Sequence, residues 1–344
     1  CFHPPMNLPS SSLGMLVACS SLVCIMPVSI QADTSGDFVY EDLGKSIRIT
    51  GYTGSGGAIV IPEYISDKPV RAIGDQAFWN KVTTTSTLQL PDNLVSIGDR
   101  AFAGCSGFTG SLDLPDSLSG IGSYAFVNCS GFTGTLEIPA HVTSMGDGAF
   151  ENCQGFTGSL FIDGGLERIP DRAFLGCSGL DGSVSIRTWV KEIGEAAFYG
   201  CNRIRMIELP DRGLTTIGKQ AFAFCTNADS YLQIPKSVTS IGDEAFRGLR
   251  ELGIIQGEVT FWGNEPVMGA NVFAEAPGLH FVFRQGASGF STPTWLGYPC
   301  RAIPNSLPVL DPIGHKTIMP GESIEIRLQA TDSDDADLVY SASN

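Results

Sequence analysis

Residues Ala101–Gly122 read AFAGCSGFTGSLDLPDSLSGIG, and close copies of this stretch recur along the chain. Its Ala-Phe pair returns at a constant 24-residue interval, so that eight phenylalanines share one phase. They are Phe78, Phe102, Phe126, Phe150, Phe174, Phe198, Phe222 and Phe246. Self-similarity at a fixed period of about 20 to 50 residues is typical of repeat proteins. The spacing therefore predicts a stack of repeated units in place of an ordinary globular domain.

Each unit opens on a short alternating segment such as SLDLP, residues 111–115, whose leucines face one side while Asp113 faces the other. This alternation is typical of a half-buried strand, and the proline ends the strand because it has no N–H to donate. A second short extended piece follows at Ile121-Gly122. An aspartate before the Ala-Phe pair suits the N-cap of one helical turn. That aspartate is present as Asp75, Asp99, Asp147, Asp171 and Asp243.

A single unit of this length cannot bury its own apolar face, whereas stacked units cover one another. The prediction is a mainly β solenoid with 24-residue repeats and a parallel sheet with short helical turns, enclosing columns of Phe, Cys and Leu.

The pattern LxLPxxLxxIGxxAFxxCxxL, repeated between about Gly51 and Phe283, resembles the BspA-like class of bacterial surface leucine-rich repeats. The resemblance implies a right-handed leucine-rich repeat solenoid over residues 57–283. Residues 33–56 are similar to the N-terminal hairpin cap of that family, and residues 284–304 are similar to its closing cap. It further implies an extracellular protein that adheres to host proteins or other cells.

Six cysteines recur at the same interval, at Cys105, Cys129, Cys153, Cys177, Cys201 and Cys225. Neighbouring cysteines on parallel rungs point the same way, which is unfavourable for the twisted geometry of a disulfide. A straight row of sulfurs does not converge on a zinc ion. No histidine recurs beside them to activate a nucleophile. We therefore expect buried free thiols that pack as small apolar side chains, and we expect Cys300 to be free or packed in the cap.

Residues 1–32 contain no Asp, Glu, Lys or Arg, and LGMLVACSSLVCIMPVSI, residues 13–30, is apolar. We predict a secretory signal peptide over residues 1–32. Two alternatives stay open. LVAC, ending at Cys19, resembles a bacterial lipoprotein box, and the apolar run is at the short limit of about 18 residues for a membrane span.

The formal net charge of −15 disfavours nucleic-acid binding, which needs a basic surface to neutralise phosphates. The four histidines, His3, His141, His280 and His315, lie far from one another in sequence, and no nucleophile elbow, phosphate loop or HExxH motif occurs. We predict that the chain is not an enzyme.

Binding residues are expected at the outward strand positions, which would form a stripe along the sheet. These positions are Val60, Gln89, Asp113, Glu137, Phe161, Ser185, Glu208, Gln233 and Thr260. Phe161 is the aromatic member, with Glu137 and Arg187 beside it, and is the candidate anchor for a ligand. The predicted binding residues are Asp113, Glu137, Phe161, Glu208 and Gln233.

The repeat ends near Asn305, and residues 305–344 alternate with Ile324, Ile326 and Leu328 on one face. The segment resembles the opening strands of a cadherin-like or immunoglobulin-like module, which implies a truncated β-sandwich after the solenoid. The resemblance also implies calcium binding by Asp332, Asp334 and Asp337, whose carboxylate oxygens suit that ion. The alternative is a solvated acidic turn. No other cofactor is predicted.

The favoured function is a secreted or cell-surface recognition and adhesion module for a protein or cell-surface glycan ligand. No nucleic acid is expected as a partner, and a membrane is expected only through an anchor outside this chain. Two alternatives stay open: a structural spacer within a large surface protein, and an accessory module of a secreted carbohydrate-active enzyme.

Overall fold

The computed structural model describes residues 33–187, 189–225, 231–249 and 257–304, and the strand residues 309–310 and 330–331. All regular elements in these ranges are β-strands. No helix in the described part of the chain has the length and apolar character needed to cross a membrane. The predicted signal peptide, residues 1–32, lies outside the described residues.

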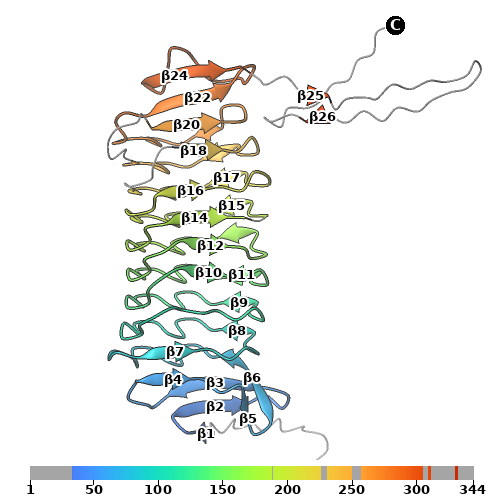
Figure 1. The fold of residues 1–344 in the computed structure, drawn as a ribbon, viewed down its shortest axis with the longest axis vertical. Coiled ribbons are helices and arrows are strands. Elements are labelled where there is room, and N and C mark those ends of the chain that lie inside the picture. The colour runs from blue at the N-terminus through green and yellow to red at the C-terminus, as the bar shows by residue number, and fades with distance from the viewer. Residues whose placement is uncertain are drawn as a thin grey trace, which may run out of the picture. The chain divides into compact units, whose positions relative to one another are not determined.

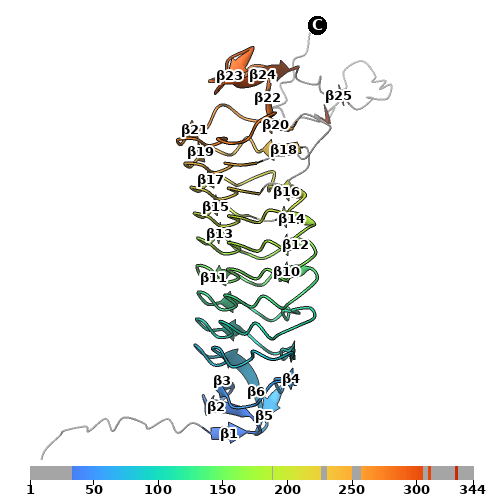
Figure 2. The same cartoon turned by 90° about the vertical axis from the view of Figure 1, so that its left-hand side faces the viewer.

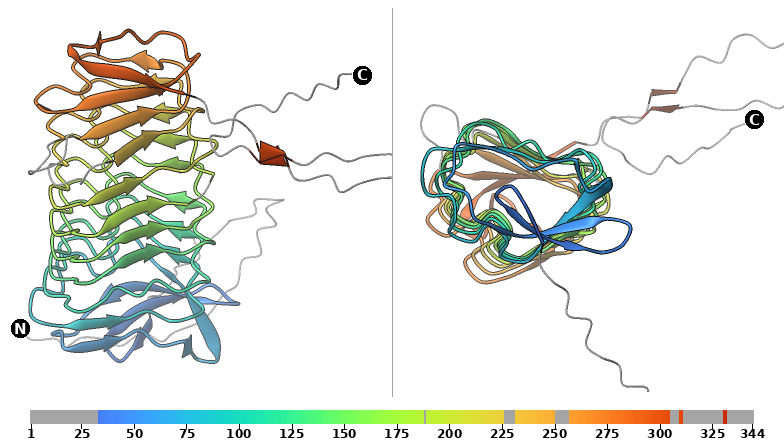
Figure 3. Two further views of the ribbon diagram at one scale, coloured as in Figure 1. Left: turned by 45° about the horizontal axis from the view of Figure 1, so that its top comes forward. Right: turned by 90° about the horizontal axis from the view of Figure 1, so that it is seen from below.

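The chain forms a β-solenoid, in which we call each turn of the coil a rung. A typical rung passes through two strands, and like strands stack into two columns (Figures 1 and 2); the segment Leu112–Leu114 has the same place in its rung but forms no strand. Viewed down the coil, successive rungs superpose around a shared interior (Figure 3). This arrangement confirms the predicted solenoid with a parallel sheet.

The first strand column holds the LxL segments, which pair in parallel with equivalent positions of the repeat opposite one another. Its strands are β4 (Ala58–Val60), β7 (Thr87–Gln89), β10 (Leu136–Ile138), β12 (Leu160–Ile162), β14 (Ser183–Ile186), β16 (Met206–Glu208), β18 (Tyr231–Ile234), β20 (Glu258–Phe261), β22 (His280–Arg284) and β24 (Tyr298–Ile303).

The second strand column holds the Ile-Gly segments, again in parallel pairs. Its strands are β3 (Ile47–Tyr52), β6 (Lys68–Ile73), β8 (Ser96–Ile97), β9 (Gly120–Ile121), β11 (Ser144–Met145), β13 (Arg168–Ile169), β15 (Glu192–Ile193), β17 (Thr216–Ile217), β19 (Ser240–Ile241) and β21 (Val267–Met268). The glycine of each pair permits close stacking: a Cβ on Gly122 would lie 2.5 Å from the backbone nitrogen of Asp99 on the preceding rung.

Antiparallel strands close the two ends of the coil. At the N-terminal end β1 (Asp33–Ser35), β2 (Phe38–Asp42) and β3 are antiparallel, and β5 (Tyr64–Ile65) pairs with β6. At the C-terminal end β23 (Thr294–Trp295) pairs with β24. Beyond the coil, β25 (Val309–Leu310) and β26 (Ala330–Thr331) form one antiparallel pair. The remainder of the predicted β-sandwich lies outside the described residues.

The predicted helical turns are wrong. The segment around each Ala-Phe pair, which we call the turn column, is a run of non-helical turns in which Arg100 and Gly104 have positive φ angles of 52° and 72°. Every second backbone N–H in this segment donates its hydrogen bond to the next rung, as the N–H of Phe102 does to Ala125 O at 2.8 Å. Those between them close local turns, as the N–H of Ala103 does on Arg100 O at 3.1 Å. A helix would keep all of these bonds within the segment.

The aspartates expected at helix N-caps serve the neighbouring rung instead. Asp99 Oδ1 accepts the N–H of Ser123, one rung further along, at 2.7 Å. The same inter-rung bond is made by the other four members of the set, Asp75, Asp147, Asp171 and Asp243. The aspartate does accept an otherwise unpaired N–H, as an N-cap would, but that N–H belongs to the next rung and not to a helix.

The eight phenylalanines form one continuous file through the core, as the sequence predicts. Successive ring centroids are 4.8–5.5 Å apart and the rings are stacked. Two residues that the repeat interval does not predict extend the file. Tyr52 stacks on Phe78 at 5.0 Å, and Phe273 stacks on Phe246 at 5.5 Å.

A second, shorter aromatic file comes from the GFTG segments. Phe108, Phe132 and Phe156 stack at 5.3 and 6.2 Å, and Phe108 meets Phe102 of the first file edge to face. The glycine before each ring is required by close approach, since a Cβ on Gly131 would lie 2.2 Å from Phe108 O. The second file was not predicted from the sequence.

The six repeated cysteines are free and fully buried, which confirms the expectation, and Cys300 is also free and buried. Each of the six donates its S–H to the carbonyl of a phenylalanine on the preceding rung, as Cys129 does to Phe102 O at 3.0 Å. The same Phe102 carbonyl also accepts the N–H of Cys105 at 3.1 Å. The thiol therefore satisfies the second acceptor site of a buried carbonyl, a polar role beyond packing.

Truncation of one ring in the file, Phe150→Ala, is expected to lower the free energy of unfolding by about 3–5 kcal/mol, because the ring is fully buried between Phe126 and Phe174. Urea denaturation followed by circular dichroism measures the change. The matched control is Trp79→Ala, a side chain that is 50% exposed, for which we expect a loss within about 1 kcal/mol. Equal losses in the two variants would contradict a shared aromatic core.

The thiols predict a loss of stability in alkali. Burial raises the pKa of Cys105 from 9.0 to about 11 and that of Cys177 to about 12. Above pH 9 the unfolded chain therefore holds fewer protons than the folded chain, so the free energy of unfolding falls as the pH rises, whereas below pH 9 the contribution is fully present. Urea titrations at about pH 8 and about pH 10 should show a smaller decline for Cys153→Ser, which has no thiol to ionise.

Candidate binding surface

The structure aligns the central part of the predicted stripe in register. Glu137, Phe161, Ser185 and Glu208 are directly paired across β10, β12, β14 and β16. Val60 pairs with Gln89 across β4 and β7, and Gln233 pairs with Thr260 across β18 and β20. The sequence thus placed these residues correctly on one column, while their role in binding stays a prediction.

The members of the stripe differ in exposure. Glu137, Glu208 and Gln233 are exposed, whereas Ser185 and Thr260 are only 3% and 7% exposed. Asp113 is exposed but lies outside a strand, and its Oδ2 accepts the hydroxyl proton of Ser111 at 3.2 Å. The accessible surface of the stripe is therefore interrupted at Ser185 and Thr260.

Phe161 is half-buried because an arginine from the next rung covers its ring. The guanidinium carbon of Arg187 lies 4.8 Å from the ring centroid, which is a cation–π contact. The Nε of the same arginine lies 3.8 Å from Asp163 Oδ1. These two contacts hold a planar, charged donor above an aromatic ring on an open sheet face, a combination that is enriched at protein interfaces.

Two exposed apolar side chains on the rungs of β14 and β16 were not predicted from the sequence. Trp189, just beyond β14, is 76% exposed, and Met206 at the start of β16 is 46% exposed. Trp189 occupies the repeat position held by Ser117 and Gly165 in other rungs. A search for residues that depart from the repeat pattern would have found it.

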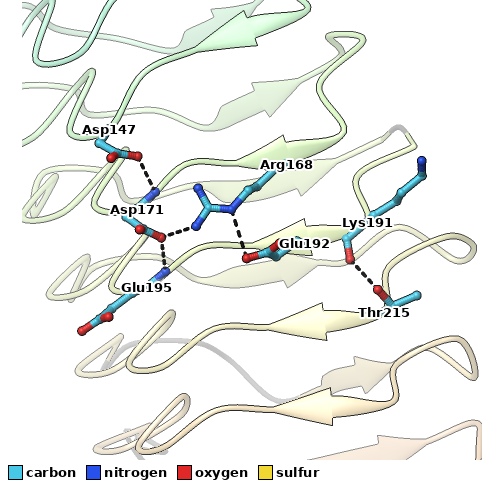
Figure 4. Close-up of polar contacts among 7 residues, drawn as sticks. All are labelled: Asp147, Arg168, Asp171, Lys191, Glu192, Glu195 and Thr215. Carbon is cyan, nitrogen blue, oxygen red and sulfur yellow. Dashed lines mark hydrogen bonds and ion pairs between the residues drawn. The ribbon is translucent and has the colours of Figure 1, made fainter.

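The second strand column carries a separate network of charges, shown in Figure 4. Arg168 donates from Nε to Glu192 Oε1 at 3.0 Å and from Nη2 to Asp171 Oδ1. Partial burial acts to lower the pKa of Arg168, but these two carboxylates outweigh it and raise the pKa. Asp171 Oδ1 also accepts the N–H of Glu195 at 2.7 Å, while the N–H of Asp171 itself is taken by Asp147 Oδ1 at 3.2 Å. The network joins neighbouring rungs and leaves little of its hydrogen-bonding capacity for a ligand.

The sequence also predicts a calcium site, formed by three aspartates. Asp332, Asp334 and Asp337 lie outside the described residues, so the calcium site stays a prediction. In the ranges that the structure does describe, no three His, Cys, Asp or Glu side chains are grouped closely enough to hold a metal ion.

Comparison with known proteins identifies the class of this coil. Six copies of the BspA type leucine-rich repeat region match residues 71–181 and 157–280, which together make up more than half of the chain. The chain therefore belongs to the BspA type leucine-rich repeat family.

Solved structures show the same fold. A leucine-rich cell surface protein from Faecalibacterium prausnitzii superposes with a TM-score of 0.55 at 24% identity, over 73% of this chain and 76% of that one. A leucine-rich repeat protein from Bacteroides ovatus gives a TM-score of 0.56 at 24% identity, over 73% and 70% of the two chains. A comparison with curated proteins finds no significant similarity. Leucine-rich repeat solenoids generally present surfaces for protein interaction.

The contribution of Asp171 to the stability of the coil can be tested with two substitutions at this position. Asp171→Ala removes the acceptor of both Glu195 N–H and Arg168 Nη2 and is expected to cost about 1–2 kcal/mol of unfolding free energy. Asp171→Asn keeps a side-chain oxygen for the Glu195 N–H and should retain most of the stability. Urea denaturation compares the two variants with the parent chain, and an Asn variant as unstable as the Ala variant would argue against the backbone bond.

Proposed function

We propose that the chain is a secreted or cell-surface module for recognition and adhesion, without enzymatic activity of its own. Its ligand, a protein or a cell-surface glycan, docks on the first strand column. The observation that carries the proposal is the registered row of Glu137, Phe161 and Glu208 with Arg187 held over the aromatic ring. The surface location is supported by the family and by the similar fold of a protein described as a cell surface protein.

Physical considerations favour the first strand column over the second. The second column is covered by inter-rung ion pairs, among them Lys191 with Glu167 at 3.2 Å and Arg168 with Glu192. On the first column, by contrast, the half-buried Phe161 ring is covered by the exposed Arg187, and Met206 at the start of β16 is exposed. An aromatic and arginine centre that becomes buried on binding, within a polar rim, is the usual anatomy of a protein interface.

Binding can be measured by capture of the purified chain on arrays of immobilised extracellular proteins and glycans. Phe161→Ala and Glu137→Ala are each expected to weaken capture at least about tenfold, the loss typical of a central contact. Trp79→Ala, which removes a half-exposed aromatic residue from the turn column, should leave capture unchanged. If Phe161→Ala and Glu137→Ala are both captured as well as the parent chain, the proposed surface is wrong and the spacer interpretation is favoured.

A further inference from the structure

Three successive rungs of the first strand column present a negative charge, an aromatic ring and a positive charge, in that order. Glu137 lies on β10, Phe161 lies on β12, and Arg187 directly follows β14. β12 is hydrogen-bonded to β10 on one side and to β14 on the other, so the two charges come from the rungs on either side of the ring. Glu137 and Arg187 are both exposed.

The row on one copy is complementary in charge to the same row on a second copy that runs in the opposite direction. A two-fold axis that runs parallel to β12, just above the Phe161 ring, brings the sheet faces of two copies together and places β10 of one copy over β14 of the other. Glu137 of each copy then faces Arg187 of the other. Because each guanidinium lies over its own Phe161 ring, the two covered rings lie at the axis with the arginines between them. Isologous interfaces of this kind, in which residue i contacts j and j contacts i, are the commonest in homo-oligomers.

The distribution of charge along the coil favours the same antiparallel orientation. Between Ala101 and Glu167 the chain has no Lys or Arg and seven acidic residues: Asp113, Asp116, Glu137, Asp147, Glu151, Asp163 and Glu167. Between Arg168 and Lys219 it has eight cationic residues, Arg168, Arg172, Arg187, Lys191, Arg203, Arg205, Arg212 and Lys219, and six acidic ones, Asp171, Asp181, Glu192, Glu195, Glu208 and Asp211, so the formal charge of this stretch is +2 against −7 for the first. An antiparallel pair sets the acidic rungs of each copy against the rungs of the other that carry the cations. A parallel pair would set like charges together, which is unfavourable.

We propose that the first strand column around Phe161 binds a second copy of this chain, antiparallel and related by a two-fold axis at Phe161. This inference rests on the proposed recognition function and identifies the ligand of the surface as the protein itself. Contact between copies on opposing surfaces would then be homophilic.

The two-fold geometry makes a prediction that a generally adhesive patch does not. Asp113 precedes β10 by one rung and Glu208 lies on β16, one rung beyond β14. The rotation about the axis at Phe161 therefore brings Asp113 of one copy toward Glu208 of the other. These like charges oppose association, so removal of one of them, in Glu208→Gln, should tighten the dimer.

Sedimentation equilibrium of the whole chain tests the proposal. The parent chain is expected to form dimers, and the single charge reversals Glu137→Arg and Arg187→Glu should each raise the dissociation constant at least about tenfold. The two reversals combined in one chain should restore dimerisation, because every contact between these two positions across the axis is again between opposite charges. Thr239→Arg, which adds a positive charge beside the second strand column, should leave the dissociation constant unchanged.

Three results would overturn the homophilic contact: a parent chain that is monomeric up to about 100 µM, a double reversal no better than the single ones, or a Glu208→Gln variant that dissociates more readily. A monomeric parent chain that is still captured through Phe161 on immobilised ligands would leave the proposed recognition function standing with a different partner. Circular dichroism of each variant confirms that the coil is intact.

Discussion

The coil depends on backbone hydrogen bonds that no rung can satisfy by itself. In the turn column alternate N–H groups point along the coil, as that of Phe102 does toward Ala125 O. A buried N–H without an acceptor costs about 1–3 kcal/mol, so each rung requires a neighbour in the correct register. The aspartates before the Ala-Phe pairs and the cysteines after them reinforce this dependence, since both side chains also bond to an adjacent rung. The constant repeat interval is thus a requirement of hydrogen bonding as much as of packing.

The same requirement explains the composition of the two ends. The last rung in either direction leaves an open core, which aromatic side chains cover. Phe38 and Tyr52 lie against Phe78 at the N-terminal end. At the C-terminal end Phe273 is followed by Phe281, whose ring is contacted edge-on by Trp295 and Tyr298. The N-terminal cap thus continues the stack with Tyr52 and places Phe38 edge-on to Phe78, whereas the C-terminal cap ends the core with edge-on rings.

The repeated residues made the coil predictable, and departures from the repeat limited the prediction. The period placed the file from Phe78 to Phe246 and the free cysteines, because a register shift of any rung would have broken both. It missed Phe273, which follows Phe246 at a longer interval than the repeat, since periodicity cannot assign the extra residues of that rung. The helical turns were predicted wrongly for a different reason. In the sequence Asp99 has the pattern of a helix N-cap. Only the stacked structure shows that its carboxylate accepts a hydrogen bond from the N–H of Ser123 on the next rung.

The candidate site was predictable in its residues but not in its contacts. Alternation placed Glu137, Phe161 and Glu208 on one side of the sheet, and the ladder registers agree. That Arg187 covers the Phe161 ring, and that Ser185 is buried, depends on side-chain conformations that alternation does not describe. Trp189 was overlooked because attention to the consensus hides the residues that violate it, and in a repeat protein those residues distinguish one rung from another.

Neighbouring rungs contact one another through the same bonds throughout the central coil. The number of rungs can therefore change without a change in the contacts between any two neighbours. Duplication or deletion of a whole rung away from Phe161 leaves every remaining rung with the neighbours it needs, and changes the span of the coil by about 4.8 Å. The span of the coil can therefore be adjusted in uniform increments, while the row of residues near its middle is kept intact.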